Sequence, residues 1–159
     1  MDVKILPLAS CPDYSAAVAE RTYRLWGRLI HEDTGMSATE FGKVIEGRAV
    51  TDRVPLTLIA LAGEALVGTV SLKQYEATTD AGLSPWIGGL LVDDAWRGKG
   101  LGAALLAQAE ATAAALGYPV LYLSCEPDIE HFYEKLGWEL MQRKLSCGDE
   151  VALMKKRLS

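Results

Sequence analysis

The fold is decided by the stretch VDDAWRGKGLGA, which occupies residues 92–103. An apolar run at 86–92, typical of a strand, precedes it, and a run with helical spacing at 101–116 follows it. Three glycines alternate with other residues between them: Gly98, Gly100 and Gly102. The first amides of a helix lack intrahelical partners, and glycines let a ligand come close to them. The stretch therefore predicts a strand, a turn that can cradle a diphosphate, and a helix.

Two other phosphate-binding patterns partly fit the same glycines. Gly98-x-Gly100-x-x-Ala103 fits the dinucleotide fingerprint, with Glu126 at about the distance of a ribose-binding acid. That fingerprint places its first glycine directly after the strand, whereas residues 93–97 intervene here, and too little chain follows for a doubly wound sheet. A P-loop needs Ser or Thr after Gly-Lys, and Lys99 is followed by Gly100. The plain alternative is a glycine-rich turn ahead of an ordinary helix.

The composition is that of an ordinary globular protein of 159 residues, and we expect one domain spanning 1–159. A formal net charge of −5 argues against nucleic acid as a main partner, because phosphate binding needs a basic surface. Cys11, Cys125 and Cys147 show neither metal-site spacing nor a disulfide framework. No apolar run reaches the roughly 18 residues that cross a membrane, and the start lacks a signal-peptide pattern. These features predict a cytoplasmic protein with no metal and no membrane partner.

Hydrophobic periodicity and turn residues divide the chain into alternating helices and strands. Ser37, with Glu40 three residues later, predicts a capping box, and the run from His31 to Gly35 is expected to end the helix before it. The expected helices lie at 14–30, 37–45, 101–116 and 129–136. The expected strands lie at 3–8, 55–61, 65–75, 86–92, 120–124, 138–145 and 151–157.

The strand at 86–92, the helix at 101–116 and the strand at 120–124 form one βαβ unit, in which the two strands run parallel. The hairpins on either side are antiparallel. We therefore expect an α/β (α+β) fold, a mixed and mostly antiparallel central sheet with one parallel βαβ insertion and helices on both faces. Gly88-Gly89 inside the middle strand predicts a bulge.

Two motifs in this order resemble those of the GNAT acyltransferase superfamily. The cofactor motif of that family reads Arg/Gln-x-x-Gly-x-Gly/Ala after a strand, and this chain has RGKGLG at 97–102. The second motif is an aromatic-Tyr pair followed three residues later by Gly-aromatic, and this chain has FYEKLGW at 132–138. The order of the expected elements also matches along the whole chain. The resemblance implies the GNAT fold and acetyl-CoA as cosubstrate.

The resemblance assigns the cofactor contacts residue by residue. It implies a diphosphate on the backbone of 98–103 and pantetheine amides on the strand edge at 90–92. A strand amide freed by the bulge would then polarise the thioester carbonyl, as in an oxyanion hole. Glu126 departs from the family pattern, which commonly has Asn at that position. The implied cofactor-binding residues are Leu90, Leu91, Val92, Arg97, Gly98, Lys99, Gly100, Leu101, Gly102, Ala103 and Glu126.

Tyr133 matches the tyrosine of the second motif, and the resemblance makes it the expected general acid. Attack of an amine on a thioester expels a thiolate, and a tyrosine with a pKa near 10 can donate the proton to it. Its alternative is a tyrosine that covers the core beside Phe132. The group that takes the amine proton is open among Glu126, Asp128, Glu76, Asp80 and a water chain.

Aromatic residues are the candidates for the acceptor side: Trp86, Trp26 and Tyr75. Such residues are also common in protein cores. We expect direct transfer of the acetyl group from acetyl-CoA to a primary amine of a small molecule, with Cys125 as a structural thiol. A protein or peptide N-acetyltransferase is one alternative, and a non-catalytic acyl-CoA sensor is another. The assembly is open between a monomer and a homodimer.

Overall fold

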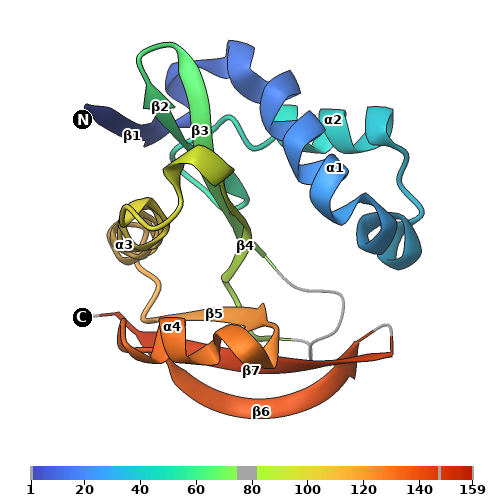
Figure 1. The fold of residues 1–159 in the computed structure, drawn as a ribbon, viewed down its shortest axis with the longest axis vertical. Coiled ribbons are helices and arrows are strands. Elements are labelled where there is room, and N and C mark those ends of the chain that lie inside the picture. Colours follow the sequence, from blue (N-terminus) through green and yellow to red (C-terminus); the bar gives the residue numbers. More distant parts are fainter. Residues whose placement is uncertain (1, 75–81, 147, 159) are drawn as a thin grey trace.

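The computed structural model describes residues 2–74, 82–146 and 148–158. Over these residues a seven-stranded sheet forms in the order β1-β2-β3-β4-β5-β7-β6 (Figure 1). The strands are β1 (Val3–Pro7), β2 (Leu56–Ala62), β3 (Ala65–Lys73), β4 (Trp86–Val92), β5 (Val120–Cys125), β6 (Glu139–Ser146) and β7 (Asp149–Arg157). The helices are α1 (Ser15–Thr34), α2 (Ala38–Glu46), α3 (Leu101–Ala115) and α4 (Glu130–Glu134).

One parallel pair interrupts an otherwise antiparallel sheet. β4 and β5 run parallel, and every other neighbouring pair is antiparallel. The helix between the two parallel strands is α3, so 86–125 forms the predicted βαβ unit. The predicted mixed sheet with one parallel insertion is therefore confirmed.

Helices cover both faces of the sheet, as predicted. Figure 1 shows α3 on one side of β2, β3 and β4, with α1 and α2 on the other side. Along β2 the side chains alternate between the two cores: Leu58 and Ala60 join the core under α3, whereas Ile59 and Leu61 join the core under α1 and α2. A strand buried on both faces needs an unbroken apolar run, and β2 has one.

The first helix is longer than the sequence pattern predicts. α1 continues through the polar run after Ile30 to Thr34 and ends at Gly35, which has a φ of 75° and donates its amide to the His31 carbonyl. Polar residues can continue a helix wherever their side chains face solvent, so the polar run does not end α1. The helix ends where Gly35 adopts the left-handed conformation. The capping box of Ser37 and Glu40 at the start of α2 is confirmed.

A glycine in β3 brings α3 close to the sheet. A Cβ atom on Gly68 would stand 2.9 Å from Leu105 Cδ1 and 3.1 Å from the carbonyl oxygen of Leu91. A larger residue would force α3 away from β3 and β4. The close approach predicted at Gly68 is thus present, and it sets the distance between α3 and the sheet at β3 and β4.

Candidate active site

β4 is bent by a bulge at its glycine pair. Where β4 pairs with β3, Gly89 and Leu90 together lie opposite the single residue Val70. Gly89 has a φ of 59°, which only glycine adopts without strain. The bulge predicted at Gly88-Gly89 is therefore confirmed, one residue further along the strand.

The other edge of β4 meets β5 at one residue pair. Trp86 lies opposite Tyr122, and the Tyr122 amide donates to the Pro85 carbonyl at 3.1 Å. Among the residues that the structure describes, no further pair joins β4 to β5. We call the edge of β4 that faces β5 at 87–92 the seam. The residues predicted to contact pantetheine, 90–92, lie on it and are half-buried.

The turn after β4 leads into a helix start that no side chain caps. Gly98 and Gly100 have φ values of 74° and 82°. A Cβ atom added to either would have no neighbouring atom within 4 Å. Gly100 is the N-cap of α3, and the first intrahelical bond is donated by Ala104 to its carbonyl at 3.0 Å. The amides of 101–103 make no hydrogen bond in the described chain. We call 98–103 the cradle, because three free amides at a helix start can hold an anion.

α4 lies next to the cradle, with Phe132 close to Gly102. A Cβ atom on Gly102 would stand 3.8 Å from Phe132 Cζ and 3.9 Å from Val92 Cγ2. The end of β4 and the middle of α4 therefore approach the first turn of α3 together. A ligand that lies along the seam can contact all three elements.

Arg97 and Lys99 are exposed and interact with the turn itself. Arg97 Nη1 lies 3.2 Å from an Asp94 carboxylate oxygen, and its Nε donates to the Val92 carbonyl at 3.4 Å. Lys99 Nζ lies 5.2 Å from the centre of the Trp96 ring. Both cations thus stabilise the connection between the seam and the cradle, within reach of its solvent side.

Tyr133 is held in α4 between two aromatic rings. Its ring contacts Phe132 edge-on at 5.0 Å and Trp138 at 6.3 Å, and 7% of the residue is exposed. Burial raises the pKa of Tyr133 to about 12, above the ordinary tyrosine value near 10. Among the described residues the Tyr133 hydroxyl has no hydrogen-bond partner, and its oxygen is not one of the fully enclosed unpaired atoms.

Cys125 ends β5 close to Tyr133. Burial is the larger cause and the carboxylates of Glu130, Asp128 and Glu126 the smaller one, and together they raise the pKa of the Cys125 thiol to about 11. A thiol with that pKa is a poor nucleophile at neutral pH. Glu126 and Asp128 are exposed at the end of β5, beyond the last buried residue of that strand.

The predicted acceptor residues lie in three different settings. Trp86 is fully buried, donates its indole N–H to the Leu83 carbonyl at 2.7 Å and packs on Tyr122, so its ring is enclosed in the core. Trp26 is half-buried on α1. Tyr75, with the two candidate bases Glu76 and Asp80, lies outside the described residues.

Sequence reasoning missed an ion pair that fixes the start of the turn. Arg21 on α1 donates through Nη1 to Asp93 Oδ1 at 2.8 Å and also to the Leu66 carbonyl. The Asp93 amide donates to the Val67 carbonyl at 2.9 Å. Arg21 and Asp93 are 72 residues apart, so no local pattern could have indicated the pair.

The model of the acetyltransferase (GNAT) family matches residues 20–138, from α1 through the cradle to the end of the second motif. This chain belongs to the GNAT acetyltransferase family. The fold and the family expected from the two motifs are therefore confirmed. No curated protein matches the chain.

Solved structures with the GNAT fold align along the whole chain. A candidate N-acetyltransferase from Lactobacillus plantarum is 26% identical with a TM-score of 0.67, and the alignment covers 100% of both chains. An aminoglycoside 6'-N-acetyltransferase in complex with coenzyme A is 16% identical with a TM-score of 0.73, covering 100% of this chain and 98% of that one. A Salmonella typhimurium protein solved with acetyl-CoA is 17% identical with a TM-score of 0.73, covering 100% and 95%.

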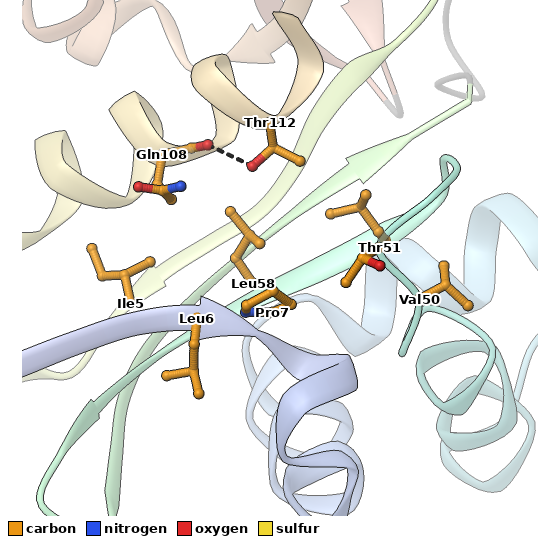
Figure 2. A pocket seen from close by; sticks show the side chains of 9 residues that line it. Ile5, Leu6, Pro7, Val50, Thr51, Leu58, Gln108 and Thr112 are labelled. Atoms are coloured by element: carbon orange, nitrogen blue, oxygen red, sulfur yellow. Dashed lines mark hydrogen bonds between the residues drawn. The ribbon is translucent and has the colours of Figure 1, made fainter. Parts of the chain in front are cut away.

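Two cavities of this GNAT domain lie between α3 and β1. One, of about 70 Å³, runs along the later turns of α3, where Gln108 and Thr112 face Ile5 and Leu58 (Figure 2). The other, of about 410 Å³, lies beside the start of α3 and is lined by Trp96, Lys99, Gly100, Leu101, Ala104, Val3 and Ile5. Apolar residues predominate in both linings.

The ranges of the GNAT domain that the structure describes hold no group of three or more His, Cys, Asp or Glu side chains suited to a metal ion. No helix in them is long and apolar enough to cross a bilayer.

Proposed function

We propose that the chain transfers the acetyl group of acetyl-CoA directly to a primary amine of a small molecule. The observation that carries this proposal is the unpaired seam of β4, which leads from the Trp86–Tyr122 pair to three free amides in the cradle. One extended ligand with amides in its middle and a diphosphate at one end matches that arrangement. Acetyl-CoA has this form, and two structures with the same fold were solved with coenzyme A or acetyl-CoA.

The cradle suits the diphosphate. Its amides point out of the helix start, and the open space at Gly98 and Gly100 admits phosphate oxygens that a Cβ atom would displace. The macrodipole of α3 adds partial positive charge at the same point. Arg97 and Lys99 add full positive charges on the solvent side of the turn.

The seam suits the pantetheine arm. Backbone groups at 90–92 that lack a strand partner can pair with two amides of the ligand, as a sheet edge pairs with a peptide. The bulge at Gly89 lies where β4 makes no pair with β5, so the arm can take the place of a strand partner there. A free amide near the bulge is positioned to stabilise the oxyanion of the tetrahedral intermediate.

Tyr133 supplies the proton that the departing sulfur needs. The amine nitrogen bonds to the thioester carbon, the carbon–sulfur bond breaks, and the Tyr133 hydroxyl protonates the sulfur. A pKa of about 12 keeps Tyr133 protonated at neutral pH. The thiol of Cys125, close by, has its pKa raised to about 11.

The amine must lose a proton during attack, and exposed carboxylates at the end of β5 are available for it. Glu126 and Asp128 lie where β5 ends, close to Cys125. A water molecule between one of them and the amine would serve equally well. Their negative charges also favour a cationic amine over an anionic acceptor.

The experiment is a measurement of CoA release from acetyl-CoA with two panels of acceptors. One panel contains small amines, including aminoglycosides and polyamines, and the other contains peptides with free N-termini and lysines. Turnover with small amines supports the proposal. Turnover with peptides alone points instead to a protein or peptide N-acetyltransferase. Tight acetyl-CoA binding with no turnover on either panel points to an acyl-CoA sensor and overturns the enzymatic proposal.

A further inference from the structure

A polar cluster joins three elements on the α3 side of the sheet, away from the cradle. Glu110 of α3 accepts from Lys156 Nζ of β7 at 2.8 Å through one carboxylate oxygen. Its other oxygen accepts from the indole N–H of Trp138 at 3.3 Å. The side chains of Glu110 and Lys156 are 17% and 25% exposed, so both are largely withdrawn from water. A partly buried carboxylate that accepts from two different elements fixes their separation.

Lys156 extends the same cluster to the end of α4. Its ammonium also donates to the Leu136 carbonyl at 2.6 Å, just beyond α4. A cation there is favourable because the last carbonyls of a helix carry partial negative charge. The next residue, Gly137, has a φ of 94°, and a Cβ atom on it would stand 3.3 Å from Lys156 Cε. The turn after α4 therefore leaves room for the lysine to reach both acceptors.

Trp138 connects this cluster to Tyr133. The Trp138 ring contacts the Tyr133 ring at 6.3 Å with an interplanar angle of 72°, and its backbone amide donates to the Tyr133 carbonyl at 3.1 Å. Trp138 is 2% exposed, so its ring has no room to move independently. Glu110 therefore holds the Trp138 side chain by a hydrogen bond, and the Trp138 ring in turn restricts where the Tyr133 ring can lie.

Glu110 and the cradle belong to the same helix. Eight residues separate Gly102 from Glu110, which places them about 12 Å apart along the axis of α3. Through Glu110, that helix is tied to Trp138 and to the turn after α4.

We propose that Glu110 is a positioning residue that sets the Tyr133 hydroxyl relative to the cradle. The inference rests on the proposed function, in which the cradle holds one end of acetyl-CoA and Tyr133 protonates its sulfur. Misplacing a reacting group by a fraction of an ångström costs about tenfold in rate or more, because proton transfer needs hydrogen-bond geometry. The cluster therefore affects kcat through Tyr133 and leaves the affinity for acetyl-CoA unchanged.

The first test is a double-mutant cycle with Trp138→Phe and Tyr133→Phe. Trp138→Phe keeps an aromatic ring but removes the N–H that Glu110 accepts. In the otherwise unchanged chain we expect kcat to fall about tenfold, with the KM for acetyl-CoA unchanged. In the Tyr133→Phe background we expect no further fall, because residues that act through one another are not additive. An equal fall in both backgrounds overturns the inference.

The second test reads the position of Tyr133 without activity. In protein labelled with 3-fluorotyrosine, the ¹⁹F resonance that is missing from Tyr133→Phe identifies Tyr133. Glu110→Gln, which can accept from only one of its two donors, should shift that resonance, and Lys156→Met should shift it too. Glu139→Gln removes an exposed carboxylate next to Trp138 and should leave it in place. An unmoved resonance in the first two variants overturns the inference.

The two proposals fail in different ways. Full activity of Tyr133→Phe shows that Tyr133 is not the proton donor. If Tyr133→Phe has a lowered kcat and Trp138→Phe lowers kcat equally in both backgrounds, only the positioning role is wrong. Melting temperatures of all variants identify any that lose the fold. For such a variant, the other member of the Glu110→Gln and Lys156→Met pair decides the outcome.

Discussion

The two edges of β5 are built very differently. Towards β7 the strand forms a continuous antiparallel ladder along its whole length, from Val120 opposite Arg157 to Cys125 opposite Ala152. Towards β4 it forms a single pair, Trp86 opposite Tyr122. The six residues of β5 are therefore paired along their whole edge towards β7, whereas their edge towards β4 is paired at one residue only (Figure 1).

The difference shows where a sheet can hold a ligand. Unpaired backbone groups away from water are costly, so a ladder continues wherever a partner strand can reach. The bulge at Gly89 lies in the part of β4 that makes no pair with β5, and the free amides of the cradle follow that part of the strand. The open edge thus costs pairing energy, which a ligand with its own amides and phosphates would restore.

Filling the cradle next to the open edge has the largest expected effect. Gly100→Glu puts a side chain and a negative charge where the diphosphate would lie. Repulsion of about 4 kcal/mol at close range predicts a loss of about 1000-fold in acetyl-CoA affinity by isothermal titration calorimetry. Gly63→Glu is the matched control, because Gly63 also has a positive φ of 62° with open space but lies in the turn between β2 and β3. Unchanged affinity in Gly100→Glu contradicts the cradle.

Removing the proposed proton donor beside the open edge comes next. Tyr133→Phe should lower kcat about 100-fold, the usual contribution of a general acid, with acetyl-CoA affinity unchanged. Because burial raises the Tyr133 pKa to about 12, its hydroxyl stays protonated and causes no alkaline fall in rate below about pH 10. Tyr118→Phe removes the same atom after the end of α3 and should retain full kcat.

A smaller effect is expected from the bulge that separates the two edges. Gly89→Ala forces a side chain into a φ of 59°, which should lower the free energy of unfolding by about 1 kcal/mol and raise the KM for acetyl-CoA. Gly42→Ala is the control with the opposite sign. Gly42 lies inside α2 with open space for a Cβ atom, so alanine should stabilise the protein by about 1 kcal/mol. Urea denaturation measures both, and equal signs would contradict the assigned bulge.

The last prediction concerns the closed edge, where Cys125 ends β5, and it is seen only in alkaline solution. Its pKa is raised from 9.0 to about 11, so between those values the unfolded chain loses the thiol proton while the folded chain keeps it. The free energy of unfolding should therefore fall as the pH rises through that window, by up to about 1.4 kcal/mol per pH unit. Cys125→Ser should make this slope shallower in urea titrations at pH 8.5 and 10.5. An identical slope would show that the thiol is not buried in the folded state.

Local signals predicted the centre of the fold well. β4 coincides with the strand expected at 86–92, and α3 begins at Leu101 as expected. Glycine turns and unbroken apolar runs act within a few residues, so they can be read without tertiary information. The polar run after Ile30 misled the prediction of the end of α1, because an exposed helix surface and a loop share the same composition.

The candidate site was predicted less completely, because burial and pairing depend on distant partners. Trp86 was expected to line an acceptor pocket, yet the sequence does not reveal that Tyr122 and Leu83 enclose it. The shifted pKa of Tyr133 depends on rings that fold around it. The link from Glu110 to Trp138 joins residues 28 positions apart and has no local pattern.

The contact between Arg21 and Asp93 has a mechanical consequence. One guanidinium holds both the carbonyl of Leu66 and the first side chain after β4. Any sliding of α1 along the sheet must stretch one of these bonds or drag the glycine turn with it. One side chain therefore links α1 directly to the turn after β4, so a displacement of the helix strains the turn that leads to the cradle.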